Sequence, residues 1–153
     1  MSVYQNSYFI VPRKGNYTLF EGLNLNSFFE DDLFEDDLLW EDLNYKYVEY
    51  EDYLNSVFKL GESWSSQLKM FGNNDTNCLK VLIENEIIVS VSFRVNFEIN
   101  YIDFLKEIIE FCKLNDWLIV DNELNTLSID FETINDNITE SKAYKNYINF
   151  FKK

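Results

Sequence analysis

The sequence predicts a single α+β domain in which helices pack on a mainly antiparallel sheet. Residues 79–83 and 86–98 each alternate apolar and polar side chains, which is the period-two pattern of half-buried strands. Residues 101–113 carry apolar side chains at spacings of three and four, as amphipathic helices do. A chain of 153 residues is long enough for one core and too short to favour a second domain. We therefore expect one domain over residues 1–153, with an acidic, loop-like segment at about residues 21–46.

The first elements of the chain are an expected strand and a turn. Residues 3–11 are rich in aromatic and β-branched side chains, and Pro12 ends this run. A turn at residues 13–16 would let residues 17–20 pair back onto the strand. The only proline and two of the four glycines lie before residue 23, so this region is the most loop-like part of the sequence.

A helix is expected at about residues 47–60, followed by a strand and a loop. Acidic residues stand near the helix start, and Lys59 and Gly61 mark its end. Alternation over residues 64–70 predicts the strand, and residues 72–76 form the loop that leads into the central hairpin. The apolar stripe of the helix is Tyr50, Tyr53, Leu54, Val57 and Phe58.

The central hairpin joins the two alternating runs through Glu84 and Asn85. Asparagine tolerates positive φ, so this connection favours a tight turn. On the second strand the only apolar residue of the polar face is Ile88. The apolar face is expected to hold Ile87, Val89, Val91, Phe93, Val95 and Phe97.

The C-terminal part is expected to contain two helices and two strands. Asn100 caps the helix at residues 101–113, Asp116 ends it, and residues 117–120 form a buried strand. A turn at 121–123 leads to a last strand with Leu127, Ile129 and Phe131 on one face. Residues 137–140 have the spacing of a capping box for a terminal helix, whose stripe is Ala143, Tyr144, Tyr147, Ile148 and Phe151.

The charge balance restricts the classes of partner. With 13 basic and 27 acidic residues, the formal net charge is −14 and the sequence pI is about 4.3. Such a surface repels nucleic-acid phosphates and anionic lipids and attracts basic proteins. No stretch has the length of a membrane span, and the start of the chain lacks the pattern of a signal peptide. We expect a cytoplasmic protein that binds neither nucleic acid nor membrane, with Cys78 and Cys112 as free, buried thiols.

The residue types present argue against most catalytic chemistry. The chain has no histidine, which removes the usual general base and nearly all zinc sites. Residues 61–65 begin like a nucleophile elbow but lack its final glycine. Residues 121–132 place Asp121, Asn125 and Glu132 at calcium-loop positions, but Thr126 replaces the required glycine. We expect no enzymatic activity, metal or cofactor; a carboxylate-dependent hydrolase is the alternative that so many acids leave open.

The strongest candidate for a functional surface is the acidic segment. Residues 21–52 contain 12 acids and one base, which gives a local net charge of −11. Acidic pairs alternate with large apolar residues, so the pattern favours a loop or broken helix that steers and anchors a basic partner. A solvated segment that only aids solubility is the alternative. The predicted partner-binding residues are Glu30, Asp31, Asp32, Phe34, Glu35, Asp36, Asp37, Trp40, Glu41 and Asp42.

The polar face of the central strand is a second, weaker candidate surface. Arg94 is one of two arginines in the chain. A salt bridge to Glu98 or to an acid of the 30s is the favoured interpretation, ahead of a ligand contact.

The order of the pieces over residues 86–151 resembles small cytosolic immunity proteins of bacterial polymorphic-toxin systems, delivered by type VI or contact-dependent machinery. The elements that carry the resemblance are the strand 88–96, a helix ending at Asn115-Asp116-Trp117, the segment 129–131, and residues 141–144 before a helix rich in aromatic residues. The resemblance implies a non-enzymatic protein that neutralises one cognate toxin, often a basic nuclease, and it transfers no functional residue. The alternative is a general interaction or scaffold module that binds through its sheet or helices, for example at Arg94 and Asn96.

Overall fold

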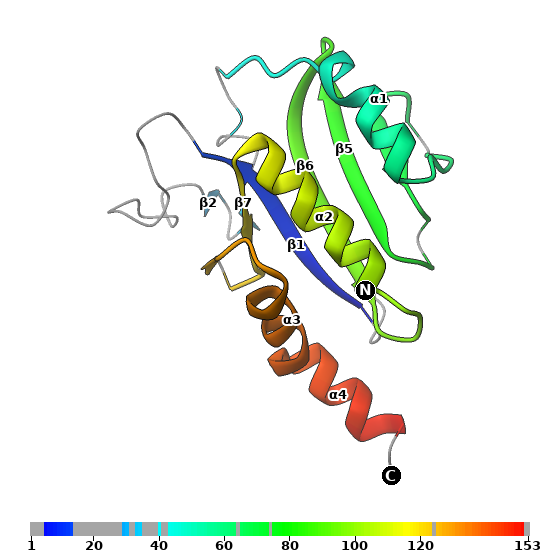
Figure 1. Cartoon of the computed structure of the whole chain (residues 1–153), viewed down its shortest axis with the longest axis vertical. Helices are drawn as coiled ribbons and strands as arrows, with labels where there is room; N and C mark the ends of the chain where they lie inside the picture. The colour runs from blue at the N-terminus through cyan, green and yellow to red at the C-terminus, as the bar shows by residue number, and fades with distance from the viewer. Residues whose placement is uncertain are drawn as a thin grey trace.

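The structure is a computed structural model that describes residues 5–13, 29–30, 33–34, 40, 43–63, 65–73, 75–123 and 125–151. Its centre is a six-stranded antiparallel sheet with the strand order β4-β5-β6-β1-β7-β8, which confirms the predicted α+β class (Figure 1). The sheet consists of β1 (Gln5–Pro12), β4 (Leu68–Phe71), β5 (Cys78–Glu84), β6 (Ile87–Asn96), β7 (Trp117–Val120) and β8 (Thr126–Leu127). A separate pair is formed by β2 (Phe29–Glu30) and β3 (Leu33–Phe34). The helices are α1 (Val48–Val57), α2 (Ile102–Asn115), α3 (Phe131–Glu140) and α4 (Lys142–Phe151).

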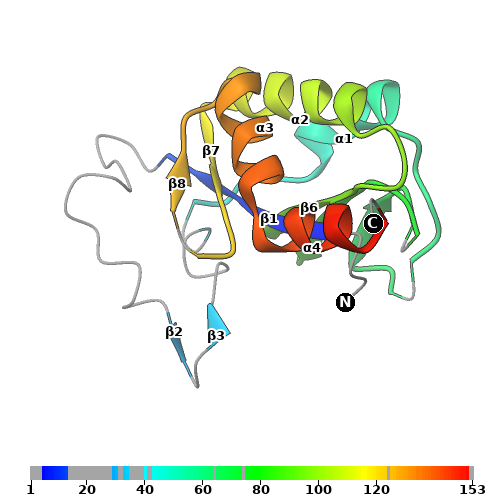
Figure 2. The same ribbon diagram turned by 90° about the horizontal axis from the view of Figure 1, so that it is seen from below.

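Two helices form a layer on one face of the sheet. Figure 2 shows α1 and α2 above the strands, and stacking of Tyr53 on Phe111 (ring centroids 5.7 Å apart) joins the two helices. The apolar side of α2 follows the predicted spacing, with Phe111 as an addition. Each large apolar side chain that is fully buried contributes about 1.5–3 kcal/mol of transfer free energy. The buried residues of α2 are Leu105, Ile108, Ile109, Phe111 and Cys112.

Strand β1 lies in the middle of the sheet although it comes first in the sequence. It pairs antiparallel with β6 on one side and with β7 on the other, so that Tyr8 lies opposite Phe93 and Ile10 opposite Ile119. The predicted N-terminal strand is therefore confirmed. The expected turn at residues 14–16 and the pairing of residues 17–20 lie outside the described residues.

The β5–β6 hairpin forms as predicted, but its turn is at Asn85 and Glu86 instead of Glu84 and Asn85, and it contains a bulge that the alternation did not reveal. Asn85 and Glu86 both have positive φ (53° and 69°), as a two-residue hairpin turn requires. The pairing shifts between Ile88 and Ser90, so Val89 is an extra residue on β6. Because one extra residue exchanges the two faces, Ile88 is buried (1% exposed) while Ile87 and Val89 are half-buried. The predicted faces are thus correct from residue 91 onward and wrong at residues 87–89.

Helix α1 and strand β4 are both shorter than predicted. The helix ends at Val57, because Phe58 is already extended (φ −116°, ψ 148°). The chain then runs beside β4, where the N–H of Gly61 donates to the carbonyl of Met70 at 2.7 Å. A side chain at Gly61 would collide with the carbonyl oxygen of Gly72, so this close approach needs glycine. Strand β4 begins only at Leu68, and Trp64 lies outside the described residues.

The ends of α2 were predicted correctly. The strand predicted at Leu127, Ile129 and Phe131 is shorter than expected. Asn100 Oδ1 accepts a hydrogen bond from the N–H of Ile102 (2.9 Å), and Asp116 ends the helix in the left-handed conformation (φ 54°). Strand β8 stops at Leu127 because Asp130 caps α3, its Oδ1 accepting from the N–H of Thr133 at 2.8 Å.

The capping box predicted at residues 137–140 is also wrong, because these residues lie inside α3. The final helix begins later: Ser141 Oγ accepts from the N–H of Tyr144 (3.1 Å) and α4 starts at Lys142. Helix α4 packs beside the sheet through Tyr144, whose ring lies 5.1 Å from that of Phe97.

Two further predictions concern the cysteines and the membrane. Cys78 and Cys112 are both free and buried, as expected. Burial raises the pKa of both thiols above its usual range, which makes them poor nucleophiles. Within the described ranges, none of the helices combines the length and the apolar character needed to span a bilayer.

Candidate functional site

The structure describes three of the ten predicted partner-binding residues. Glu30 lies in β2 and Phe34 in β3, where they take part in a short antiparallel pair instead of the expected loop or broken helix. Trp40 is the third. The other seven fall outside the described residues: Asp31, Asp32, Glu35, Asp36, Asp37, Glu41 and Asp42.

Trp40 belongs to the core and is not the exposed anchor that the prediction requires. Its side chain is 1% exposed, and its ring meets Trp117 edge to face with centroids 4.9 Å apart. Tyr45 adds a second edge contact at 5.9 Å. Edge-to-face aromatic pairs of this kind stabilise by about 0.5–1.5 kcal/mol beyond the area they bury. Trp40 therefore attaches the end of the acidic segment to the sheet and offers no surface to a partner.

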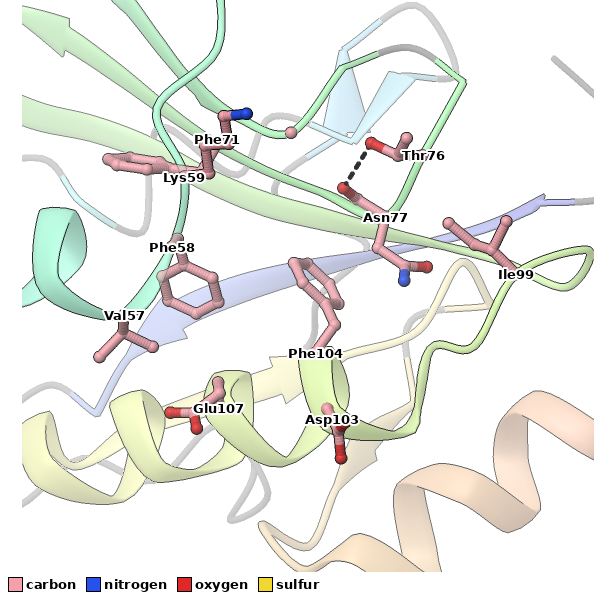
Figure 3. Close-up of a pocket in the computed structure, with 11 residues that line it drawn as sticks. Val57, Phe58, Lys59, Phe71, Thr76, Asn77, Ile99, Asp103, Phe104 and Glu107 are labelled. Atoms are coloured by element: carbon pink, nitrogen blue, oxygen red, sulfur yellow. Dashed lines mark hydrogen bonds between the residues drawn. The ribbon is translucent and has the colours of Figure 1, made fainter.

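A groove lies at the C-terminal end of α1, among the described residues. It lies where α1 ends, beside the first turns of α2 and the loop between β4 and β5 (Figure 3). Its volume is about 450 Å³, which is within the range of ligand-binding clefts.

The floor of this groove is aromatic. Phe58 and Phe104 point toward one another between α1 and α2, with ring centroids 5.7 Å apart (Figure 3). The ring centroid of Phe71 lies 6.2 Å from that of Phe58. The extended backbone after Val57 turns the ring of Phe58 inward, which explains why the helix end and the groove coincide. Ile99, 41% exposed, contributes an accessible apolar surface at the rim.

One wall of the groove contains Gly72, Thr76 and Asn77 and is held by hydrogen bonds. Gly72 has a φ of 102°, and a side chain there would collide with the carbonyl oxygen of Asn77. The amide of Asn77 donates to the carbonyl of Asn100 (3.1 Å) and accepts from the N–H of Asn96 (2.8 Å). The loop is thereby fixed to the start of α2, and these two bonds orient the Asn77 amide.

The rim on the α2 side is acidic. Asp103 and Glu107 are exposed and four residues apart, so both carboxylates lie along one side of the helix at the groove. Lys59 lies across the groove from α2 (Figure 3). The ion pair within the described residues joins Arg13 to Asp116 (3.1 Å), so neither rim carboxylate has a salt-bridge partner there. The site thus combines an apolar floor with two carboxylates that form no ion pair among the described residues, with Lys59 on the opposite side of the groove.

Comparison of the chain with models of protein families, with curated proteins and with solved structures finds no match. The chemistry of the groove and the sequence are therefore the basis for inferring function. An apolar centre with a charged rim is the general anatomy of a protein-protein interface.

The polar face of β6, the second candidate surface, is largely engaged within the protein. Arg94 Nη2 donates to the carbonyl of Asn73 (3.1 Å), and it forms no salt bridge with Glu98. The acids at positions 31–37, also expected as partners, lie outside the described residues. Asn96 is 5% exposed, its amide donating to the carbonyl of Asp75 and accepting from the N–H of Glu98. This arrangement fixes the 72–77 loop on the sheet and leaves Asn96 unavailable for binding.

The calcium-like run at residues 121–132 forms a hydrogen-bonded turn. Asp121 Oδ1 accepts from the N–H groups of Glu123 and Asn125, and Oδ2 accepts from the side-chain amides of Asn125 and Asn137. Four donors thus occupy the carboxylate that a metal would need. Among the described residues, no three His, Cys, Asp or Glu side chains converge to form a metal site.

The sequence did not reveal the groove. By helical spacing, Asp103 and Glu107 fall on the polar side of α2, and Phe58 and Phe104 fall on apolar stripes. Their juxtaposition depends on how α1 packs against α2. The signal available beforehand was Phe58, which comes directly before the basic residue and the glycine that mark the helix end.

Proposed function

We propose that this protein is a non-enzymatic binding protein that recognises a basic protein through acidic surfaces. The observation that carries the proposal is the groove beside α2, where the half-buried Phe104 and the exposed Ile99 adjoin two carboxylates without a salt-bridge partner among the described residues. The net charge of −11 over residues 21–52 also favours a basic partner. Together these charges favour approach of a basic surface over that of any anionic one.

The sequence resemblance suggests that this partner is a bacterial toxin. Immunity proteins of bacterial toxin systems neutralise one toxin in the cytoplasm, and many such toxins are basic nucleases. We propose that this chain acts likewise: long-range attraction raises the association rate, apolar contacts slow dissociation, and the bound chain covers the surface that the toxin needs. None of these steps requires a catalytic group.

The general scaffold module remains a second proposal, but its predicted surface has less support. That hypothesis places binding on the sheet or the helices; at its named example, the polar face of β6, Asn96 is buried and bonded to Asp75 and Glu98. The groove, in contrast, is open and its charges are unpaired.

Co-expression with the product of the neighbouring gene tests the proposed function. The expected result is that the neighbour alone stops growth of the host, that this chain restores growth, and that the two co-purify at low salt. A neighbour that is harmless, or that stays toxic without forming a complex, would contradict the immunity function.

A further inference from the structure

The groove beside α2 is built to receive a side chain without first rearranging. Its floor is fixed by the core contacts of Phe58 and Phe71, and its wall by the bonds of Asn77 to Asn96 and Asn100. A site that is already ordered loses little conformational entropy on binding. The groove therefore suits a short anchor from a partner.

The floor selects for an apolar anchor. Ile99 and Phe104 present carbon surface to the groove, whereas the nearby amide of Asn77 is held by hydrogen bonds to Asn96 and Asn100. A polar side chain placed against this carbon surface would lose its water without gaining a hydrogen bond from it. An aromatic or branched aliphatic side chain would gain buried area instead.

The charges on the rim determine which residue of the partner is favoured next to the apolar anchor. Asp103 and Glu107 lie about one helical turn apart on the α2 side, whereas Lys59 lies on the opposite side. The negative charge is thus confined to one edge of the groove. A lysine or arginine adjacent to the anchor pairs with this edge, and the orientation that directs it at Lys59 is disfavoured.

We infer that the groove binds one aromatic or branched aliphatic side chain of the basic partner, flanked by a lysine or arginine that pairs with Asp103 or Glu107. This inference rests on the proposed function and adds the chemistry of the contact. It assigns the groove the role of anchor site, while the acidic segment acts mainly in steering.

Peptide binding followed by nuclear magnetic resonance tests the inference without knowledge of the partner. The probes are three capped pentapeptides, Gly-Lys-Phe-Arg-Gly, Gly-Lys-Ala-Arg-Gly and Gly-Glu-Phe-Glu-Gly, titrated into the nitrogen-15-labelled full chain. The first is expected to shift the amide signals of residues around Phe58, Asn77 and Asp103, and to bind about tenfold more tightly than the other two. Equal shifts with the phenylalanine and alanine peptides, or shifts confined to other regions, would overturn the inference.

A pair of matched variants links the peptide result to the structure. Ile99→Lys places a cation at the groove rim and is expected to weaken binding of Gly-Lys-Phe-Arg-Gly about tenfold. Leu114→Lys makes the same change at a residue that is 66% exposed in the last turns of α2, and binding should be unchanged. Equal effects of the two variants would show that net charge alone is responsible. Both sites are exposed, so both variants should fold, as circular dichroism will verify.

The same variants separate this inference from the proposed function. If this chain rescues cells from its toxic neighbour and Ile99→Lys rescues equally well, the groove is not the anchor site although the function stands. If wild type fails to rescue, the proposed function fails, whereas specific binding of the phenylalanine peptide would still show the groove to be an apolar, acid-rimmed site.

Discussion

The hydroxyl of Tyr8 donates a hydrogen bond to Oδ1 of Asn137 at 2.9 Å, across 129 positions of the sequence. The side-chain amide of Asn137 extends this hydrogen-bond network, because its Nδ2 donates to Asp121 Oδ2 at 3.0 Å. Asn6 donates to the oxygen of Tyr8 (2.9 Å) and completes the network. One asparagine on α3 thus joins the central strand β1 to the turn after β7, which fixes α3 against the sheet.

Replacing Asn137 with alanine should destabilise the protein by about 1–2 kcal/mol, because it removes the acceptor of the Tyr8 hydroxyl and one of the four donors to the buried Asp121 carboxylate. Urea unfolding followed by circular dichroism measures the change. Asn146→Ala, on the exposed side of α4, is the control and should change stability by less than about 0.5 kcal/mol. Similar losses in the two variants would indicate that the network does not stabilise the fold.

Trp40→Ala should cost about 3–5 kcal/mol, because it removes a large buried side chain from contact with Trp117. Trp40→Phe should cost much less: it keeps an aromatic ring, and the indole N–H of Trp40 has no acceptor among the described residues. Denaturant midpoints of the three proteins provide the comparison. A fully stable Trp40→Ala variant that loses partner binding would restore Trp40 to the role of surface anchor.

Glu86→Gly should stabilise the protein by about 1 kcal/mol. Glu86 is held at a φ of 69°, which glycine adopts without steric cost, and Asn-Gly is the preferred pair for such turns. The thermal midpoint should rise accordingly. Glu84→Gly removes the same charge from strand β5 and should lower the midpoint, so it separates the backbone effect from the electrostatic one.

Stability should fall as the pH rises from about 10 to 12. Desolvation by burial, with smaller contributions from Glu51 and Glu49 respectively, raises the pKa of Tyr47 and of Tyr50 to about 12. Unfolded tyrosines titrate near pH 10, so in this window the unfolded state has lost protons that the folded state still holds. Below pH 10 both states are neutral at these positions, and the contribution is constant.

Measurement of the unfolding free energy at several pH values checks this prediction. Tyr50→Phe removes one of the two groups and should flatten the decline between pH 10 and 12. A Tyr50→Phe curve parallel to that of wild type would show that Tyr50 ionises as easily in the folded chain as in the unfolded one.

Replacing Asp31, Asp32, Asp36 and Asp37 with asparagine should slow association with the basic partner and reduce the salt dependence of its rate. Charged surfaces act on the rate of encounter more than on dissociation. The control changes four exposed glutamates elsewhere to glutamine: Glu62, Glu84, Glu123 and Glu140. Stopped-flow measurements at low and high salt compare the two variants. Equal association rates for wild type and the aspartate variant at low salt would exclude the acidic segment as the steering surface.

Several elements of the fold were predictable because their signals are local. The hairpin turn at Asn85, the cap at Asn100 and the stop at Asp116 all depend on residues close to one another in the chain. The start of α3 was missed although its signal is equally local: the alternation at Leu127 and Ile129 was extended through Asp130, which in fact caps the helix. The bulge at Val89 was missed for a different reason, since it is defined only by the pairing with β5.

The candidate site was less predictable than the fold. Sequence drew attention to the acidic segment by composition, of which the structure describes Glu30, Phe34 and Trp40, with Trp40 buried. It gave no sign that Phe58, which follows α1, and Phe104 of α2, 46 positions later in the sequence, share one groove.

The sequence by itself determined the α+β class, the central hairpin, the long helix after it and the strong negative charge. These follow from periodicity, capping residues and composition, which act over a few residues or over the whole chain at once. Only the tertiary structure decided that β1 lies between β6 and β7, that Trp40 is core and that Asp103 and Glu107 border an apolar groove. Such features depend on which apolar surfaces pack together, and many pairs of surfaces in one sequence satisfy the same local patterns.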